Sequence, residues 1–440
     1  MPETLENVRK FAADVAQCMK CGFCSYYCPV YREEKDEKAL ARGKNQLIRF
    51  LLKGEQELTE GFYGAIDNCL LCKTCVQYCP AKTRIDHAVI AARGDYAAER
   101  GLPLSKSLVF RHVLSRRWLF GWALRVASWF QFLLPRGEGK FRHLPQFLTA
   151  LGAGRAVPEI APKFLRDSLP ERNPAVGERR YRVGLFSGCA TEYMFPEVGR
   201  RIVDILTGLG CEVVFSRAQA CCGAPVFFSG DLETGRNLAR QNLEAFEGCD
   251  YIVTGCATCG SGLADYPVYL SESPEEKARF EAFAARVRDF NAFVIDVLAA
   301  EPGRFQLEPR FRGKTVTWHD PCHLTRHQGV AAQPRKILNA LEGLRFVEMP
   351  DADRCCGLGG SYSITHHDTS KKIADHKVAG FEASGADAVV TACPGCIIQL
   401  RDALSRHGNG AEVVHIGELF RVKRSALDGP GDGPAPTADP

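Results

Sequence analysis

The sequence predicts an α+β protein, with a helical, cysteine-rich N-terminal domain followed by two related α/β domains. Two observations support this fold class. Dense cysteine runs in the first 100 residues flank a helical stretch around Lys44–Leu52. From Tyr181 onwards, short apolar runs alternate with helical segments, and this alternation occurs twice. Strands that alternate with helices of this length are typical of βαβ units and parallel sheets.

Changes in composition along the chain divide it into six parts. In chain order they are a helical domain (1–100), a helical and irregular connector (101–180), a first α/β domain (181–270), a helical linker (271–313), a second α/β domain (314–420) and a disordered tail (421–440). The connector is rich in Pro and Gly punctuation. The tail is too polar and too rich in Pro and Gly to pack.

The two α/β domains repeat one pattern. The first copy reads RVGLFSGC, EVVFS, CCG and YIVTGCATC, with helix-like runs between these pieces. The second reads TVTWHDPC, RFVEM, CCG and AVVTACPGC in the same order. Each outer cysteine group follows a strand-like run, and open α/β sheets bind ligands at the carboxyl ends of their strands. The sequence therefore predicts two similar sites.

The high cysteine content indicates the class of protein. The chain has 440 residues, 20 of them cysteine, with 45% hydrophobic and 25% charged residues and a net charge of +4. A chain of this size buries a large core without disulfides. Its start, MPETLENVRKF, has no apolar signal region, so we expect a cytoplasmic protein whose reduced cysteines bind metal. No stretch has the basic density and interleaved aromatic residues of a nucleic-acid groove, which argues against that partner.

The N-terminal cysteines spell C-x2-C-x2-C-x3-C-P twice. They are Cys18, Cys21, Cys24 and Cys28 in the first run, and Cys69, Cys72, Cys75 and Cys79 in the second. Four thiolates hold one cubane, and in two-cluster ferredoxins the fourth cysteine of each run binds the other cluster. We therefore expect two [4Fe–4S] cubane clusters, one on Cys18, Cys21, Cys24 and Cys79, the other on Cys69, Cys72, Cys75 and Cys28. A pair of zinc sites is the alternative, but zinc needs neither the third close cysteine nor the proline.

The α/β domains contribute ten further cysteines at matched positions. They are Cys189, Cys221, Cys222, Cys256 and Cys259 in the first copy, and Cys322, Cys355, Cys356, Cys393 and Cys396 in the second. Five thiolates exceed the four that a tetrahedral zinc ion uses, so we expect a larger metal cluster or a redox-active thiol group. Structural zinc or reduced thiols are the alternative. Gly223 and Gly357 relieve the sharp turn after each cysteine pair, and we expect Cys211 and Cys249 in the core.

These motifs resemble the glycolate oxidase iron–sulfur subunit family, within a wider group of cysteine-rich (CCG) proteins. That group includes lactate-utilisation iron–sulfur subunits and heterodisulfide reductase subunits. The resemblance runs from Lys10 to about Phe420 and includes ARGKNQLI, CLLCKTCVQYCP, HDPCHL, CCGLGGSYSI and HIGELF. It implies a subunit that takes electrons from a separate flavoprotein 2-hydroxy-acid dehydrogenase and passes them to the membrane quinone pool or another acceptor. Both copies end in a complete C-x2-C pair, which departs from the typical glycolate subunit and is similar to heterodisulfide reductases, whose CCG motifs hold non-cubane [4Fe–4S] clusters.

Three functions are therefore weighed. The first is the iron–sulfur subunit of a glycolate- or D-lactate-type dehydrogenase. The second is a disulfide reductase acting at CCG-bound non-cubane clusters, and the third is a zinc-stabilised assembly scaffold. The chain has no GxGxxG after a strand and no phosphate-binding loop. Since oxidation of a hydroxy acid needs a hydride acceptor, we expect an FAD-containing partner subunit.

An apolar segment of the connector, Trp118–Leu134, contains Arg125, Ser128 and Gln131, so it is a poor membrane-spanning helix. We expect it to pack inside the protein. Anchoring at a membrane surface or docking to a partner subunit is the alternative, because tryptophans with flanking arginines suit such a surface.

Several histidines and cations lie near the cysteines in the sequence. His319 and His323 flank the first cysteine of the second copy, and His366–His367 follow its CCG. Such histidines tune a cluster by hydrogen bonding or relay protons, although they more often satisfy backbone groups. Arg42 and Lys44 lie between the two N-terminal runs, and either would raise the potential of a cluster close to it.

Overall fold

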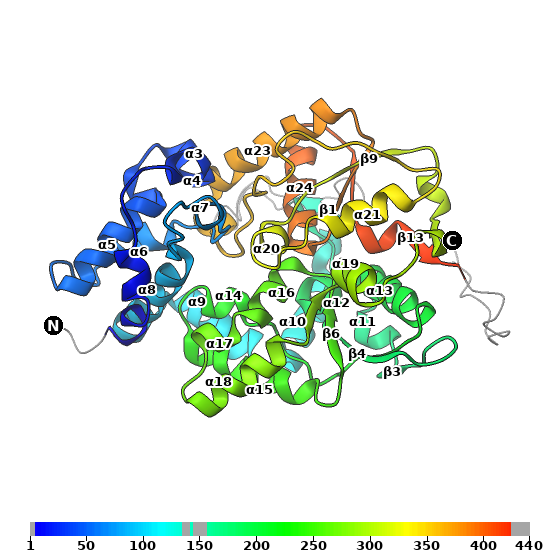
Figure 1. The fold of residues 1–440 in the computed structure, drawn as a ribbon, viewed down its shortest axis with the longest axis horizontal. Helices are drawn as coiled ribbons and strands as arrows, with labels where there is room; N and C mark the ends of the chain where they lie inside the picture. The colour runs from blue at the N-terminus through cyan, green and yellow to red at the C-terminus, as the bar shows by residue number, and fades with distance from the viewer. Residues whose placement is uncertain (1–4, 134–140, 144–155, 424–440) are drawn as a thin grey trace.

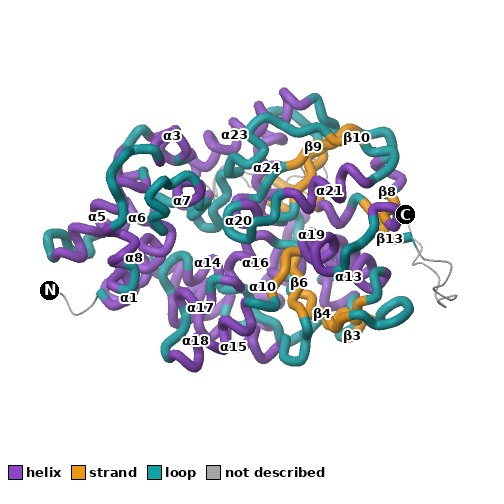
Figure 2. Tube along the Cα trace, in the orientation of Figure 1, coloured by secondary structure: helices purple, strands orange, loops and turns teal. Residues whose placement is uncertain are grey.

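The computed structural model describes residues 5–133, 141–143 and 156–423 (Figure 1). The helical N-terminal domain, in blue, lies at one end of the molecule, and the two α/β domains lie beside it, one in green and the other in yellow to red. Figure 2 shows the strands gathered in the α/β part, while the N-terminal end is helical. This arrangement confirms the fold class expected from the sequence.

Short helices and cysteine loops surround one long helix in the N-terminal domain. The helices are α1 (Glu6–Arg9), α2 (Ala12–Ala16), α3 (Cys24–Tyr27), α4 (Pro29–Glu34), η1 (Glu37–Ala39), α5 (Ala41–Lys53), α6 (Glu60–Asp67), α7 (Thr74–Gln77) and α8 (Ile85–Arg100). Helices α1, α2, α5 and α6 all pack against α8. The residues of α8 from Ile85 to Ala97 are buried apart from His87, because neighbouring helices cover α8 on nearly all sides. Gly54, with a φ of 77°, ends α5 in the left-handed conformation.

The connector that follows is mostly helical. Its elements are α9 (Leu104–Leu108), the π-helical η2 (Val109–Leu114), α10 (Arg117–Phe130), η3 (Gln131–Leu133), the antiparallel pair β1 (Phe141–His143) and β2 (Ala156–Pro158), and α11 (Leu165–Ser168).

Helix α10 does not pack inside the protein, so that expectation was wrong. None of its residues is buried, and its three tryptophans are 62% to 69% exposed. Two ion pairs attach it to the domain behind. They are Arg117–Glu192 (3.2 Å) and Arg125–Asp167 (2.7 Å). The hydrophobicity of a helix does not show whether another part of the protein packs on its apolar face, so the sequence alone could not predict the exposure of α10. No helix in the described residues is long and apolar enough to span a membrane.

The first α/β domain is built on a five-stranded sheet in the order β3-β5-β4-β6-β7. Its strands are β3 (Arg172–Asn173), β4 (Tyr181–Leu185), β5 (Cys211–Val214), β6 (Tyr251–Thr254) and β7 (Val287–Asp289). Only the β3–β5 pairing is antiparallel. The helices are α12 (Gly188–Tyr193), α13 (Pro196–Gly208), α14 (Ala224–Phe227), α15 (Leu232–Ala245), α16 (Ala257–Ala264), α17 (Tyr266–Tyr269) and α18 (Pro274–Ala284).

Residues 271–313 are not wholly helical, which corrects the expected linker. Strand β7 adds an edge to the first sheet, and β8 (Phe305–Leu307) pairs with β13 (Phe420–Val422) near the end of the chain. Strands of three residues are too short to show alternation in a sequence. The rest of this stretch holds α19 (Phe290–Ala292), η5 (Phe293–Val297), η6 (Pro302–Arg304) and η7 (Pro309–Phe311). Of the expected disordered tail, residues 424–440 lie outside the described residues.

The second α/β domain has a four-stranded, wholly parallel sheet in the order β10-β9-β11-β12. Its strands are β9 (Thr315–Trp318), β10 (Arg345–Phe346), β11 (Ala388–Thr391) and β12 (Glu412–His415). Its helices are α20 (Cys322–Thr325), α21 (Ala332–Ala340), α22 (Tyr362–Thr365), α23 (His367–Ser384), α24 (Pro394–Arg406) and η8 (Ile416–Glu418). In both sheets the cysteines follow the carboxyl ends of three strands: β4, β5 and β6 in the first, and β9, β10 and β11 in the second.

Candidate metal centres

The N-terminal cysteines line two neighbouring cavities. One is lined by Cys18, Cys21, Cys24, Cys75 and Cys79, and the other by Cys28, Cys69, Cys72 and Cys75. The last cysteine of each run therefore lies with the first three of the other run, as crossed ligation requires. Cys75 borders both cavities, so the two sites are immediate neighbours.

The two cysteine loops repeat one backbone conformation. Lys20 and Gly22 have positive φ angles of 58° and 82°, and the residues 51 positions later, Leu71 and Lys73, have 52° and 59°. The cysteines of the two runs are also 51 positions apart. Residues other than glycine rarely adopt this conformation, which costs about 1–3 kcal/mol and persists where the surroundings impose it. The same strained turn, built twice, indicates two sites of the same kind.

A buried lysine lies against the second of these cavities. Lys44 lines it and donates from Nζ to the carbonyl oxygens of Lys38, at 3.0 Å, and Ala39. Burial lowers the pKa of Lys44, while the nearby Cys69 and Cys28 oppose that shift. Arg42 lines the other cavity and pairs with Glu37 at 2.6 Å. Both cations noted in the sequence therefore lie beside cysteine sites.

The five cysteines of the first CCG domain form one connected group. Neighbouring thiols lie within hydrogen-bonding reach of one another in four pairs: Cys189 and Cys221, Cys221 and Cys222, Cys222 and Cys259, and Cys259 and Cys256. Hydrogen bonds from Cys221 and Cys259 lower the pKa of Cys222 to about 6. Cys189 is exposed, whereas Cys222, Cys256 and Cys259 are buried.

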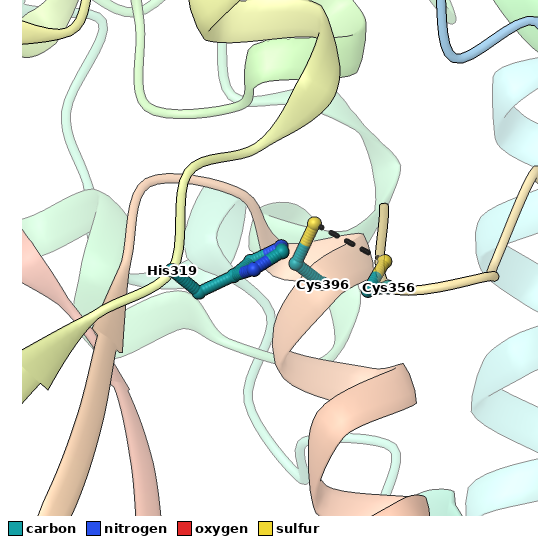
Figure 3. A group of neighbouring side chains, drawn as sticks. All are labelled: His319, Cys356 and Cys396. Carbon is teal, nitrogen blue, oxygen red and sulfur yellow. Dashed lines mark hydrogen bonds between the residues drawn. The ribbon is translucent and has the colours of Figure 1, made fainter. Parts of the chain in front are cut away.

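The second CCG domain gathers its five cysteines in the same way. Cys355 lies within hydrogen-bonding reach of Cys322 and Cys356, and Cys396 within reach of Cys356 and Cys393. The Sγ atoms of Cys356 and Cys396 are 3.5 Å apart (Figure 3). Hydrogen bonds from neighbouring thiols lower the pKa of Cys356 and of Cys393 well below the ordinary value.

The two groups meet and join the N-terminal sites. Cys256 of the first domain lies within hydrogen-bonding reach of Cys393 of the second, and the backbone N–H of Ala257 donates to the carbonyl oxygen of Ala392 across the same junction at 3.2 Å. At the other end, Cys72 lies within reach of Cys355. The ten CCG cysteines therefore form one row between the exposed Cys189 and the cavity that holds Cys72. We call it the thiol row.

The two cysteines left out of the pattern lie elsewhere. Cys211, on β5, and Cys249 are buried in the hydrophobic core, as expected. Burial raises the pKa of Cys211 to about 12 and also raises that of Cys249.

The donor set fits a metal cofactor. All 20 cysteines are free of disulfides, and thiolate is the soft ligand of iron–sulfur clusters and zinc. Burial raises the pKa of Cys28 to about 12 and also raises the pKa of Cys75 well above its ordinary value. Such thiols lose their protons only when a metal supplies positive charge, because an unpaired buried charge is costly.

Two cations near the thiol row had no signal in the sequence. The Arg326 side chain is 2% exposed and lies beside Cys72, Cys322 and Cys355, whose charges raise its pKa. Lys377 donates from Nζ to the carbonyl oxygen of Asp351 at 2.7 Å, and burial lowers its pKa to about 8. These residues are distant in sequence from most of the cysteines, so only the fold shows their position.

The histidines singled out in the sequence have different surroundings. His319 is fully buried against Cys356 and Cys396. His323 bonds to Ser261 at 2.7 Å. His366 stacks on Tyr362 with ring centroids 4.5 Å apart.

Both halves of the chain match known domain families. Residues 14–83 match the 4Fe-4S dicluster domain, and residues 183–264 and 316–401 match the cysteine-rich domain, CCG. The dicluster match supports two [4Fe–4S] clusters in the N-terminal domain. The matches and the cysteine geometry together define the iron–sulfur subunit of an oxidoreductase.

Similar proteins identify the family to which this subunit belongs. A probable glycolate oxidase iron-sulfur subunit from Bacillus subtilis (strain 168) is 30% identical over 92% of this chain and 93% of its own length. Lactate utilization protein A from Geobacillus kaustophilus is 34% identical over 55% of this chain and 99% of its own. One of the subunits of a fumarate reductase (CoM/CoB) from Methanothermobacter marburgensis is 28% identical over 96% and 74%. The chain belongs to the glycolate oxidase iron–sulfur subunit family.

A solved structure shares the fold. It is a hypothetical protein from Helicobacter pylori, with a TM-score of 0.50, 10% sequence identity, and coverage of 95% of this chain and 72% of that one. At this identity the likeness concerns the fold alone.

Proposed function

We propose that this chain is the electron-transfer subunit of a glycolate- or D-lactate-type dehydrogenase and does not oxidise substrate alone. It receives electrons from a separate FAD-containing subunit that oxidises a 2-hydroxy acid, and passes them toward a quinone or another acceptor. The observation that carries this proposal is the continuity of the cysteines. Two adjoining N-terminal cavities lead through Cys72 and Cys355 into the thiol row, so bound metals would follow one another closely.

The eight N-terminal cysteines hold two cubanes in this proposal. One is held by Cys18, Cys21, Cys24 and Cys79, and the other by Cys69, Cys72, Cys75 and Cys28, following the lining of the two cavities. Each [4Fe–4S] cluster supplies one-electron chemistry when bound. The buried Lys44 ammonium stabilises negative charge in its cavity and so favours the reduced state there.

The CCG cysteines hold one or two further centres, either non-cubane [4Fe–4S] clusters or zinc. Five thiols converge in each domain, more than one tetrahedral ion uses. Gly223 and Gly357, with φ angles of 75° and 89°, let the chain turn after each cysteine pair. A Cβ on Gly357 would come within 2.8 Å of the Ser370 carbonyl oxygen, so glycine is required there.

A second candidate function is reduction of a disulfide at the CCG centres. It is favoured by the contact between Cys256 and Cys393, which brings the two groups together, and by the position of Cys189, an exposed residue at the other end of the thiol row. Cleavage of a disulfide to two thiols consumes two electrons and two protons. Two one-electron centres side by side would deliver the electrons, and water would supply the protons.

We further propose that the protein works at the inner face of the cytoplasmic membrane, with the outer face of α10 against lipid. Trp118, Trp122 and Trp129 lie at helical spacing on that face. Residues 101–133 contain five Lys or Arg and no Asp or Glu, which complements an anionic surface. Of these cations, Arg116 is exposed and has no ion pair among the described residues, while the others pair with carboxylates behind them. The tryptophans therefore supply most of the attraction.

The donor is tested by mixing the holoprotein anaerobically with a flavin dehydrogenase encoded beside it. Addition of glycolate or D-lactate is expected to bleach the cluster absorption only when both proteins are present. Dithionite serves as the positive control for reduction. Bleaching by dithionite, but by no 2-hydroxy acid, would contradict the proposed donor and leave the disulfide reductase in first place.

A further inference from the structure

His319 is a buried histidine whose ring nitrogens face only the thiols. It directly follows β9, its side chain is fully buried, and among the described residues neither Nδ1 nor Nε2 makes a hydrogen bond of good geometry, although the Cys356 thiol lies within reach. A ring nitrogen and the Sγ atoms of Cys356 and Cys396 all lie within 4.8 Å of one another. Figure 3 shows the ring pointing toward the two sulfurs. Buried polar groups normally have hydrogen-bond partners, and one without a partner destabilises the fold, so this arrangement favours a bound ligand.

The backbone holds this side chain in place. The His319 N–H donates to the Val390 carbonyl oxygen at 2.9 Å, and its own carbonyl oxygen accepts from the Thr391 hydroxyl at 3.1 Å. These bonds attach His319 to β11, the strand that precedes Cys393 and Cys396. Hydrogen bonds to the neighbouring strand β11, and not a flexible loop, therefore fix the position of the ring next to the cysteines.

The first CCG domain has no counterpart to this imidazole. Three positions before the leading cysteine of each copy stand His319 and Phe186, and both are fully buried. The repeats differ at a second position, where the buried Lys377 of α23 replaces Asn242 of α15. Asn242 bonds to the Cys221 carbonyl oxygen at 2.9 Å and to Tyr266 at 3.0 Å. At these two positions the first site has neutral side chains, whereas the second has an imidazole and a cation; the cation nearest the first site is Arg117, which lies by Cys189.

We propose that His319 binds, through a ring nitrogen, the metal centre held by the cysteines of the second CCG domain. The first CCG site then has thiolate ligands only, and the second has mixed nitrogen and sulfur ligands. This inference rests on the proposal that the second CCG site binds metal. Cysteine with histidine is a common donor set for zinc, and histidine in place of cysteine raises the potential of an iron–sulfur centre. The same ligand therefore suits either metal.

The experiment detects nitrogen at the second site. Holoprotein is prepared with 15N-histidine in a Cys222→Ser background, which disables the first site. If the second centre contains iron, pulsed EPR reports the 15N coupling. If it contains zinc, X-ray absorption at the zinc edge reports one nitrogen among sulfur ligands. The test variant is His319→Phe, which copies the residue of the first domain. The matched control is His407→Gln, a surface histidine 3.0 Å from Asp375.

We expect histidine coupling, or one zinc–nitrogen bond, in the parent and in His407→Gln, and its complete loss in His319→Phe. In iron-containing protein the midpoint potential of the second centre also falls in His319→Phe. If the variant loses the metal instead, His319→Cys is expected to restore it without the nitrogen signal. Metal without histidine coupling in the parent, or coupling that persists in His319→Phe, would overturn this inference alone. A parent without metal at the second site would overturn the proposed cofactor as well, so the two failures are distinguishable.

Discussion

Replacing Lys73 by Met tests how the dicluster domain is held against the first CCG domain. The Lys73 Nζ lies 3.4 Å from an Asp86 oxygen and 3.5 Å from an Asp265 oxygen, and the three side chains are at most 3% exposed. Asp86 belongs to α8, whereas Asp265 ends α16 of the first CCG domain. The lysine therefore bridges two domains beside the predicted cluster ligands Cys72 and Cys75.

The expected loss follows from these distances. Two unit charges at 3.4 Å attract by about 5 kcal/mol at an effective dielectric constant of about 20, and removing one partner of a buried pair costs about 3–5 kcal/mol. Asp86 keeps Arg84 at 2.9 Å and Asp265 keeps His327 at 3.1 Å. We therefore expect the lower end, about 3 kcal/mol. For 440 residues that unfold as one unit, this corresponds to a fall in melting temperature of roughly 3 °C.

The assay is thermal unfolding of the anaerobic holoprotein, followed by far-UV circular dichroism and cluster absorption, with iron content measured first. Lys53→Met is the matched control, because Lys53 pairs with Glu55 at 3.6 Å with both side chains about half exposed. Such pairs contribute about 0–1 kcal/mol. Adding Asp265→Asn to Lys73→Met should recover part of the loss. A Lys73→Met protein as stable as Lys53→Met, with full iron content, would refute the reasoning.

Other substitutions probe the path between the centres and the outer face of α10. Arg326→Leu removes a cation beside Cys72 and Cys355, so it should lower the midpoint potential of the nearest N-terminal cluster in an EPR titration. Arg326→Lys keeps the charge and should largely preserve that potential. Equal midpoint potentials in the parent and both variants would contradict this prediction. Cys355→Ser interrupts the contact with Cys72. In stopped-flow experiments the N-terminal clusters should still be reduced, whereas reduction of the CCG centres should slow at least tenfold. An unchanged rate of reduction at the CCG centres would show that electrons do not pass through this contact. Replacing all three α10 tryptophans by serine should abolish co-sedimentation with anionic phosphatidylglycerol vesicles. The fluorescence of the buried Trp318 still shows whether the core is folded. Vesicle binding that persists in this variant would exclude α10 as the lipid contact.

The sequence predicted the parts of the sites that depend on local spacing. The doubled N-terminal string pointed to crossed cysteine groups, and the cavity linings of Cys28 and Cys79 agree with that crossing. The CCG repeat placed cysteines after strands, and the sheets show them there. In each case the informative residues are close in sequence or related by the repeat.

Other features depend on how the domains meet. The joining of the CCG groups at Cys256 and Cys393 results from the packing of the two α/β domains, in which α16 contacts α20, and no local pattern encodes this packing. Nothing in the sequence distinguishes Arg326 from other arginines, and only the fold shows that it lies beside three cysteines. The outward face of α10 was mispredicted, because an apolar stretch signals burial only when something covers it. His319 was noted, but its unsatisfied ring required the three-dimensional contacts to be seen.

The most direct test of the continuous series of metal centres is an anaerobic analysis of iron, sulfide and zinc, with EPR redox titration of the same sample. We expect about eight irons and eight sulfides from the two N-terminal clusters, whose reduced signals broaden because the clusters are neighbours. Beyond these, we expect either about four irons for each CCG centre or stoichiometric zinc. Eight irons with neither further iron nor zinc would leave the CCG cysteines as free thiols and contradict a metal series beyond Cys72. Fewer than eight irons in fully reconstituted protein would contradict the two-cluster domain itself.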